Sequence, residues 1–426
     1  MHLNHISARP REERGATMMV FSILLAFGVS MGMLAISVDV GAMMLERRQL
    51  QNGADATSLA LADVCARGEA DCNPATNTPV LKPLLNLNSG RDAKSQFDPA
   101  RGTNGQCGRV PGEPAMPGCP TTGDITDLRE CTPLPSWLTT GDGVNIPYVE
   151  TYSLTESNES DPSLLPRYFS QLLAGGGSDV SVTACARAAW GAPKSFAATV
   201  PVTFSTCEWQ RATSNGADYV EDGPMGPWPG YGGAGQPAWP DASKEVVIQL
   251  QDPSAEDADC AWNGKDTSGG FGYIREADGT GCSALVSTDG WTRIDTGNSV
   301  SPDCTTGFGG MRGTTINIPV FDCMLRSHSQ PTGDIPVGTD CDPATNESGG
   351  ANTYYHIVGW AKFYLSGYKI SGTGQPSVRS GSVPCSGGDR CLSGWFLQGS
   401  LQNVSEIQAP VPGDTDFGTY AVLPAG

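Results

Sequence analysis

Positive charge is scarce in this sequence. Its 426 residues include 26 Lys and Arg against 45 Asp and Glu, which gives a formal net charge of −19. A chain that binds nucleic acid or anionic lipid through its overall charge needs an excess of basic residues. The composition therefore argues against DNA binding and predicts an acidic exterior. The 54 Gly and 32 Pro predict long connections between short elements.

Familiar catalytic motifs are also missing. The sequence has no G-x-S-x-G, no H-E-x-x-H and no Walker loop, so the usual signatures of a nucleophile, a catalytic metal or a bound nucleotide are absent. Paired acidic residues occur in loops at Glu221–Asp222 and Glu256–Asp257, but a glycosidase needs a carboxyl separation that a sequence does not show. We expect no enzymatic activity, no cofactor, no bound metal and no small-molecule substrate.

Cysteine is absent from the beginning of the chain and from close metal-ligand pairs. Beyond the N-terminal region the histidines are His328 and His356, and no C-x-x-C pair accompanies them. An even number of cysteines spread through Gly/Pro-rich sequence is typical of disulfides in an oxidising compartment. We expect up to seven bridges, with the pairing open, among Cys65, Cys72, Cys107, Cys119, Cys131, Cys185, Cys207, Cys260, Cys282, Cys304, Cys323, Cys341, Cys385 and Cys391.

Charge is absent from one long apolar stretch, Gly15 to Val38. At about 1.5 Å per residue this stretch can cross a hydrocarbon core of about 30 Å. A cleaved secretory signal is the alternative, but its best cleavage site, Ala35-x-Ser37, follows an apolar run longer than the roughly 7 to 15 residues of a signal. The sequence therefore predicts a retained transmembrane helix over residues 15–38.

The charges that flank this stretch predict its orientation. Arg9, Arg11 and Arg14 precede it, whereas Arg47 and Arg48 are the nearest basic residues after it. The excess of basic residues marks the cytoplasmic side. We expect a single-pass protein of the cell membrane with a cytoplasmic tail at residues 1–14 and an extracytoplasmic exterior.

Residues 39–63 are rich in helix-forming side chains, so we expect the transmembrane helix to continue outside the membrane. Within the membrane Gly28 and Gly32 form a small-xxx-small pair that permits close approach of a second helix. Steps of three and four residues trace a narrow stripe that suits packing against another helix. The stripe consists of Val38, Ala42, Leu45, Gln49, Asn52, Ala56 and Leu59.

The stretch "RGATMMVFSILLAF…AISVDVGAMMLERRQLQNGADATSLALA" resembles the N-terminal segment of the TadE/TadG-like proteins of Flp (tight-adherence) pilus assembly. The pattern combines an Arg-Gly start, an apolar span, D-V-G and R-R-x-L-Q-N. Prepilin-like substrates carry Glu five residues after the cleavage Gly, but here Val20 holds that position, so processing stays open. The resemblance places the motif on Arg14, Gly15, Asp39, Gly41, Arg47, Arg48, Gln51, Asn52 and Asp55.

This resemblance implies a structural or accessory role in pilus assembly. The expected partners are the lipid bilayer and other pilus-assembly proteins or minor pilins. Some relatives carry a von Willebrand A domain with a D-x-S-x-S metal motif, but "DVSVT" at Asp179–Thr183 lacks a preceding apolar strand. Its alternation favours an ordinary strand.

For the rest of the chain the sequence predicts an α+β exterior. Residues 64–162 are rich in turn residues and are expected to form a loop-rich disulfide region; residues 163–426 form a mostly β ectodomain that opens with a short helix from Ser163 to Gly175. The β-branched and aromatic runs predict strands. These strands are Asp179–Trp190, Ala198–Trp209, Lys244–Leu250, Thr314–Leu325, Asn352–Ile370 and Leu392–Ser400.

A Gly/Pro-rich stretch, Gly223 to Pro240, presents Trp228, Tyr231 and Trp239. Flat aromatic faces on such a loop suit a sugar or a protein partner, while the plainer interpretation is that these rings fill a small core. The sequence therefore leaves an alternative function open, a surface adhesin or glycan-binding module on the same membrane anchor.

Overall fold

The structure is a computed structural model. It describes residues 14–68, 72–89, 95–110, 116–119, 131–155, 182–221, 242–249, 271–274, 284–288, 290–293, 308–331, 352–370, 373–409 and 417–426. Within these ranges some side chains, including those at positions 14–17, 35, 36, 39 and 42, lie outside the description.

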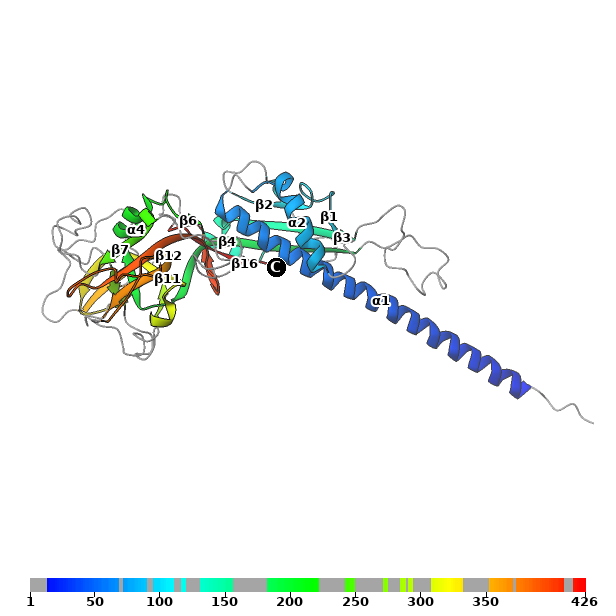
Figure 1. Ribbon diagram of the computed structural model, residues 1–426. Coiled ribbons are helices and arrows are strands. Elements are labelled where there is room, and N and C mark those ends of the chain that lie inside the picture. The colour runs from blue at the N-terminus through cyan, green and yellow to red at the C-terminus, as the bar shows by residue number, and fades with distance from the viewer. Residues whose placement is uncertain are drawn as a thin grey trace, which may run out of the picture.

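A single helix, α1 (Arg14–Arg67), extends over 54 residues. It contains no proline, and its Ala, Leu, Met and Gln side chains favour helix. Its first half projects away from the remainder of the protein, and its second half lies along a sheet (Figure 1). We call these the projecting half and the docked half of α1. The expected continuity of the helix through Asp39 is present. Within the described residues, no helical segment has both the length and the apolarity needed to cross a membrane.

A second helix, α2 (Pro74–Asn88), corrects the expectation that residues 64–162 form a loop-rich region. The Asn73 side chain caps the helix by accepting a hydrogen bond from the Ala75 amide at 2.9 Å, and Pro74 fits the first turn. Pro79 and Pro83 lie inside the helix, where each lacks an amide donor. Burial of the apolar face of α2 against α1 outweighs that loss.

The docked half of α1, together with helix α2, covers an antiparallel sheet (Figure 1). We call this sheet the proximal sheet, and the sheet with its covering helices the proximal lobe. Its central pair is β3 (Tyr148–Thr155) and β4 (Thr183–Ala198), paired from Tyr148↔Ala189 to Leu154↔Thr183. Strands β1 (Ser95–Phe97), β2 (Gln106–Arg109) and β3 lie within residues 64–162, so the expectation of a loop-rich region was wrong for them. On the other side of β4 lies β16 (Thr419–Pro424).

The second group of strands, the distal lobe, is built on two long strands, β11 (Thr315–Ser327) and β12 (Asn352–Ile370). Next to β12 lies β14 (Cys391–Ser400), and β5 (Val202–Ser205) pairs in parallel with β11. The other described strands, with helix α4 (Thr206–Thr213), are β6 (Val220–Glu221), β7 (Val246–Gln249), β8 (Phe271–Tyr273), β9 (Ala284–Ser287), β10 (Gly290–Arg293), β13 (Thr373–Gln375) and β15 (Glu406–Gln408).

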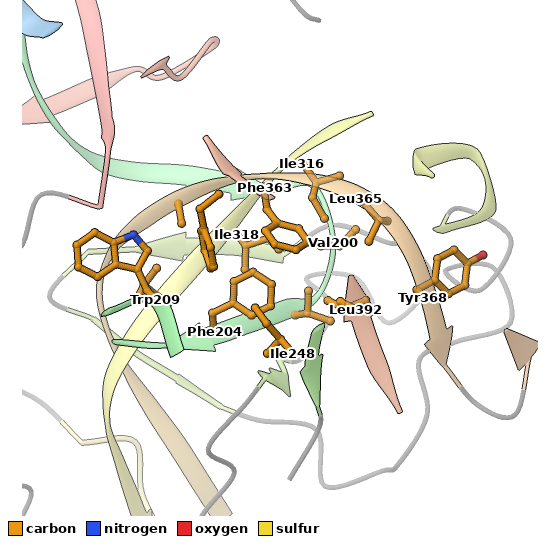
Figure 2. Packing of buried hydrophobic residues seen from close by; sticks show 14 of the residues in the cluster. Val200, Phe204, Trp209, Ile248, Ile316, Ile318, Phe363, Leu365, Tyr368 and Leu392 are labelled. Carbon is orange, nitrogen blue, oxygen red and sulfur yellow. The ribbon is translucent and has the colours of Figure 1, made fainter. Parts of the chain in front are cut away.

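The core of the distal lobe is apolar and aromatic (Figure 2). The rings of Phe204, Phe363 and Phe396 meet edge to face, with centroids 5.2 to 5.5 Å apart. Such geometry adds to the stabilisation from area burial. The core joins β5, β12 and β14, whose order in sequence gives no hint of their adjacency.

Strand β16 connects the two lobes into one hydrogen-bonded sheet. It pairs antiparallel with β4 and parallel with β14, giving the order β1-β3-β4-β16-β14-β12-β11-β5-β8. The proximal and distal lobes therefore share backbone hydrogen bonds as well as side-chain contacts.

The strand predictions vary in accuracy. Asn352–Ile370 coincides with β12, and the predicted mixture of helices with a β-rich, disulfide-bridged fold is confirmed. The expected strand Ala198–Trp209 is wrong beyond Ser205, because the Ser205 hydroxyl accepts the Glu208 amide at 3.1 Å and starts α4. The helix expected from Ser163 to Gly175 lies outside the described residues.

Candidate assembly interface

The docked half of α1 presents one apolar face to the proximal sheet. Leu50, Ala54 and Leu61 are fully buried. Leu50 packs against Val182 and Ala184 at the start of β4, and Leu61 belongs to a larger cluster between α1, α2 and the sheet. Because these positions recur every three or four residues, one face of the helix is committed to its own protein.

Hydrogen bonds fix the position of α1 along its axis relative to the sheet. The Gln51 side-chain amide donates to the Cys185 carbonyl at 2.8 Å, and the Thr151 hydroxyl donates to the Ala54 carbonyl at 2.9 Å. Thr57 also lies 3.3 Å from Thr151, hydroxyl to hydroxyl. Buried polar groups require specific partners, so these bonds define the register of α1 on β3 and β4.

Helix α2 packs against α1 at a point of close approach. A methyl group at Gly53 would lie 2.9 Å from both the Leu85 Cδ1 atom and the Leu85 carbonyl oxygen, so only glycine fits there. The disulfide Cys65–Cys72 closes the turn between the two helices. The hairpin was missed because its prolines resemble turn signals; the Asn-Pro start and the spacing of Leu81 and Leu85 were available signals.

The last turn of α1 is bound to β16. The Tyr420 hydroxyl donates to the Asp63 carboxylate at 2.8 Å and accepts from the Arg67 guanidinium at 3.2 Å. Burial raises the pKa of Tyr420 above its ordinary value, and the Asp63 carboxylate raises it further. The helix end is thus attached to the strand that also connects the two lobes.

The stripe predicted for helix packing lies on another face of α1. At about 3.6 residues per turn, Leu45, Asn52 and Leu59 lie on the side roughly opposite Leu50, Ala54 and Leu61. Leu45 is 54% exposed, Val38 and Asn52 are exposed, and Gln49, Ala56 and Leu59 are partly buried. The side chain of Ala42 lies outside the description. The stripe stays a prediction, and Val38, Leu45 and Asn52 are its accessible members.

The projecting half of α1 carries large apolar side chains on its surface. From Met18 to Leu34 the Met, Val, Phe, Ile and Leu side chains are about half exposed or more. A methyl group added at Gly28 or Gly32 would have no described atom within 4 Å. The predicted small-residue pair therefore lies on open helix surface, without a packing partner among the described residues.

Comparison with known families adds an independent observation. Residues 15–63 match the family model of Flp pilus-assembly TadE/G-like proteins. This segment is TadE/G-like. The resemblance seen in the sequence is therefore confirmed, and the family indicates a pilus-related role and a location in the cell envelope. No curated protein and no solved structure gives a significant match to the chain.

The TadE/G-like segment ends near the end of α1, so it covers both the projecting half and most of the docked half. Among the motif residues, Gln51 binds β4 and also donates to Asp55 at 2.9 Å. Gly41, Arg47, Arg48 and Asn52 are exposed. The side chains of Arg14, Gly15 and Asp39 lie outside the description.

The cysteines in the described part of the chain are all bridged. The pairs are Cys65–Cys72, Cys107–Cys119, Cys131–Cys185 and Cys385–Cys391. Cys207 and Cys323 are disulfide-bonded as well, whereas Cys260, Cys282, Cys304 and Cys341 lie outside the described residues. Bridges of this density are typical of an oxidising compartment.

Behind the docked helix, the sheet contains a buried ion pair. The Arg187 guanidinium contacts the Glu150 carboxylate at 2.5 Å, and both side chains are almost inaccessible. Tyr152 donates to the same carboxylate at 2.6 Å, and burial together with Glu150 raises the pKa of Tyr152. Glu150 also lies beside the sulfur atoms of two bridges, but bridged sulfur is not a thiolate and does not provide a metal ligand.

A cleft of about 730 Å³ lies on the proximal lobe between two short 3-10 helices, η2 (Ser136–Leu138) and η3 (Gly141–Asn145), and β15. Trp137 is 39% exposed at its edge. Lys194 and Glu406 add charges of both signs, and Ile146 and Ile407 add apolar surface. The aromatic residues singled out in the sequence, Trp228, Tyr231 and Trp239, lie outside the described residues.

Proposed function

We propose that this protein is a membrane-anchored structural or accessory component of Flp/Tad-type pilus assembly, which acts through helix packing and contacts of its exterior. The observation that carries the proposal is the TadE/G-like match over a helix whose projecting half exposes apolar side chains. Water does not favour such a surface, and a bilayer or neighbouring helices would cover it. The role requires no chemistry, and we propose none.

The proposed topology is a single span over residues 15–38 with a cytoplasmic N-terminus. It is supported by the uncharged stretch, by the basic residues before it and by the bridged cysteines after it. The proposed partners are the lipid bilayer and other pilus-assembly proteins or minor pilins.

The first test is the N-terminal sequence and intact mass of the protein extracted from native membranes. A chain that keeps residues 15–38 and resists carbonate extraction supports the retained anchor. Cleavage after Gly15 would favour a processed minor pilin despite Val20. Cleavage near Ser37, with release of the remainder, would overturn the anchored role.

The packing role is tested with Leu45→Arg, which places a charge on the exposed stripe without touching the sheet-facing side of α1. Co-purification with pilus components should fall to background while the protein is still exported. Val144→Arg is the matched control, because Val144 is a similarly exposed apolar residue, 46% accessible, on η3. Equal recovery of pilus components with both variants would contradict the packing role.

The cleft beside Trp137 favours a second candidate, an adhesin or glycan-binding module on the same anchor. One aromatic wall with several polar groups at the rim is a common arrangement in ligand sites. Titration of the full-length protein with oligosaccharides would test it. Binding that disappears in Trp137→Ala supports this function, and no binding to any oligosaccharide removes it.

A further inference from the structure

The wall of the cleft that β15 forms contains a β-bulge. In the pairing of β15 with β4, Glu406 lies opposite Ser195. The next residue of β15, Ile407, lies opposite Pro193, so Lys194 is an extra residue on β4 without a partner in the pairing. Bulges redirect side chains and are frequent beside ligand sites. The bulge explains why Lys194, in the middle of a long strand, lines the cleft together with Glu406.

Hydrogen bonds fix the backbone of both walls of the cleft. At the bulge, the Thr288 amide donates to the Lys194 carbonyl at 2.8 Å. On the wall formed by η3, the Arg109 guanidinium donates to the Gly143 carbonyl at 2.9 Å and to the Ile146 carbonyl at 2.6 Å. A site with ordered walls loses less conformational entropy when a ligand binds. The cleft is therefore formed before a ligand enters it.

A ligand in the cleft meets a mostly polar surface with one aromatic ring. Ile146 and Ile407 line the cleft but are only 3% and 8% exposed, so they present little apolar area. Hydroxyl groups both donate and accept hydrogen bonds, as the hydroxyls of a sugar require, and an indole ring offers an apolar face to a sugar ring. A peptide would need deeper apolar pockets for its side chains. The exposed lining residues are Trp137, Thr140, Lys194, Ser405, Glu406 and Pro424.

The two charged groups of the cleft have no counter-ion of their own. Both side chains are exposed, and neither the Lys194 ammonium nor the Glu406 carboxylate forms an ion pair or a side-chain hydrogen bond with any part of the chain that the structure describes. Neighbouring side chains on paired strands have Cβ atoms about 5 to 8 Å apart, so one sugar residue reaches both charges. A ligand with a single charge is attracted by one group and repelled by the other. A ligand with both charges is complementary to the pair.

We propose that this cleft binds a saccharide that carries both an ammonium group and a carboxylate, with the ammonium at Glu406, the carboxylate at Lys194 and the sugar ring against Trp137. The inference rests on the second candidate function and names its ligand class. On β16, Leu423 lines the cleft, whereas the next residue toward the N-terminus, Val422, packs in the cluster beneath α1. The cleft therefore opens on the face of the proximal sheet opposite α1, and ligand binding can be tested separately from helix packing.

Four monosaccharides test the charge requirement. Muramic acid carries both groups, N-acetylmuramic acid only the carboxylate, glucosamine only the ammonium and N-acetylglucosamine neither. Each is titrated against the full-length protein, in a detergent without a sugar head group, by ligand-observed proton NMR. Muramic acid should bind tightest, and each singly charged sugar about threefold to fivefold more weakly. Equal binding of all four sugars would overturn the inference.

Variants assign the two preferences to their residues. Glu406→Gln should remove the preference for muramic acid over N-acetylmuramic acid, and Lys194→Met should remove the preference over glucosamine. Trp137→Ala should weaken the binding of all four sugars. Asp389→Asn and Lys82→Met are the matched controls, because each removes a charge of the same sign outside the cleft, and both should keep the two preferences. Thermal unfolding checks that each variant is folded, and preferences that survive in both cleft variants contradict the proposed site.

Glycylglycine distinguishes a saccharide site from a general site for zwitterions, because it has both charges but no sugar ring. Binding of this dipeptide as tight as that of muramic acid would overturn the saccharide assignment. If none of the four sugars binds, the inference fails. The second candidate function fails with it only when the oligosaccharide titration is negative as well. Sugar binding without any charge preference removes this inference alone, and the pilus-assembly role is decided separately by Leu45→Arg.

Discussion

The two halves of α1 belong to one continuous helix, but one half is packed against the protein and the other is exposed. In the docked half, Leu50, Ala54 and Leu61 are fully buried against the proximal lobe, and Gln51 is hydrogen-bonded to β4. In the projecting half, Leu34 is 62% exposed and Gly28 has no described neighbour around it. Both halves are rich in Ala, Leu and Met, but residues 15–38 of the projecting half carry no charge, whereas the docked half carries charged residues. The difference is whether the chain folds back onto the helix.

The comparison indicates that the two halves of α1 have different roles. The docked half positions the helix on the proximal sheet, and its sheet-facing side chains are already buried there. The apolar side chains of the projecting half remain accessible. Substitutions in the docked half should therefore affect folding, whereas substitutions in the projecting half should affect association only.

The largest effect on stability is expected at the buried ion pair of Arg187 and Glu150, which lies behind the docked half of α1. Arg187→Leu leaves the Glu150 carboxylate uncompensated behind the helix and removes bonds to the Thr132 and Ala425 carbonyls. We expect a loss of about 3–5 kcal/mol in the free energy of unfolding, measured by urea denaturation of the full chain in detergent.

A double variant, Arg187→Leu with Glu150→Leu, provides the control, because it removes both charges. Its loss should be clearly smaller than that of Arg187→Leu alone, since no buried charge is left unpaired. If the double variant is as unstable as the single one, the ion pair is not what supports the sheet behind α1.

Truncation of the same residue type in the two halves sharpens the comparison directly. Leu61→Ala should reduce the free energy of unfolding by about 2–5 kcal/mol, because it leaves a cavity in the cluster between α1, α2 and the sheet. Leu34→Ala should change it by less than about 0.5 kcal/mol. Similar losses at both positions in thermal unfolding would mean that the projecting half is folded against the protein.

A pair of glycines tests the contact of α1 with α2. Gly53→Val forces atoms against the Leu85 backbone and should cost about 1–3 kcal/mol. A Cβ atom at Gly41 has no described atom within 4 Å, so Gly41→Val should be close to neutral. Hydrogen exchange of α2 amides is the readout, and unchanged protection in Gly53→Val would show that the hairpin tolerates separation.

The smallest effect concerns alkaline pH at the end of the docked half. Burial holds the Tyr420 pKa above its ordinary value near 10. The folded protein therefore keeps a proton that the unfolded chain loses. The stabilisation is complete below pH 10 and is lost as the pH rises above it, by about 1.4 kcal/mol per pH unit for one group.

Tyr420→Phe should flatten this decline when unfolding is measured between pH 9 and pH 11. A residual slope is expected from Tyr148, Tyr152 and Tyr368, whose pKa values are also raised by burial. An unchanged slope in Tyr420→Phe would contradict the assignment of this proton to the end of α1.

Local patterns in the sequence predicted the elements that depend on local physics. The apolar run and the absence of proline predicted α1, and alternating β-branched and aromatic residues predicted β12 at its observed bounds. The prediction failed where distant contacts outweigh local preference. Pro79 and Pro83 are tolerated in α2 because Leu81 and Leu85 are buried against α1.

In the candidate interface, too, some residues were predicted from the sequence and others were missed. The stripe through Leu45 and Asn52 was visible in the sequence because it depends only on helical spacing. The exposed residues Val80 and Leu87 of α2 were missed because their helix was predicted to be turns.

By itself, the sequence determined a long N-terminal helix, an acidic cysteine-rich remainder and the likeness of residues 15–63 to TadE/G-like pilus-assembly proteins. Only the tertiary structure decided which face of that helix is used internally and which remains accessible. The reason is physical: helical periodicity defines stripes, but burial depends on which strands lie beside them. Cys185 and Thr151 are far from Gln51 and Ala54 in sequence, and no local pattern predicts that they meet.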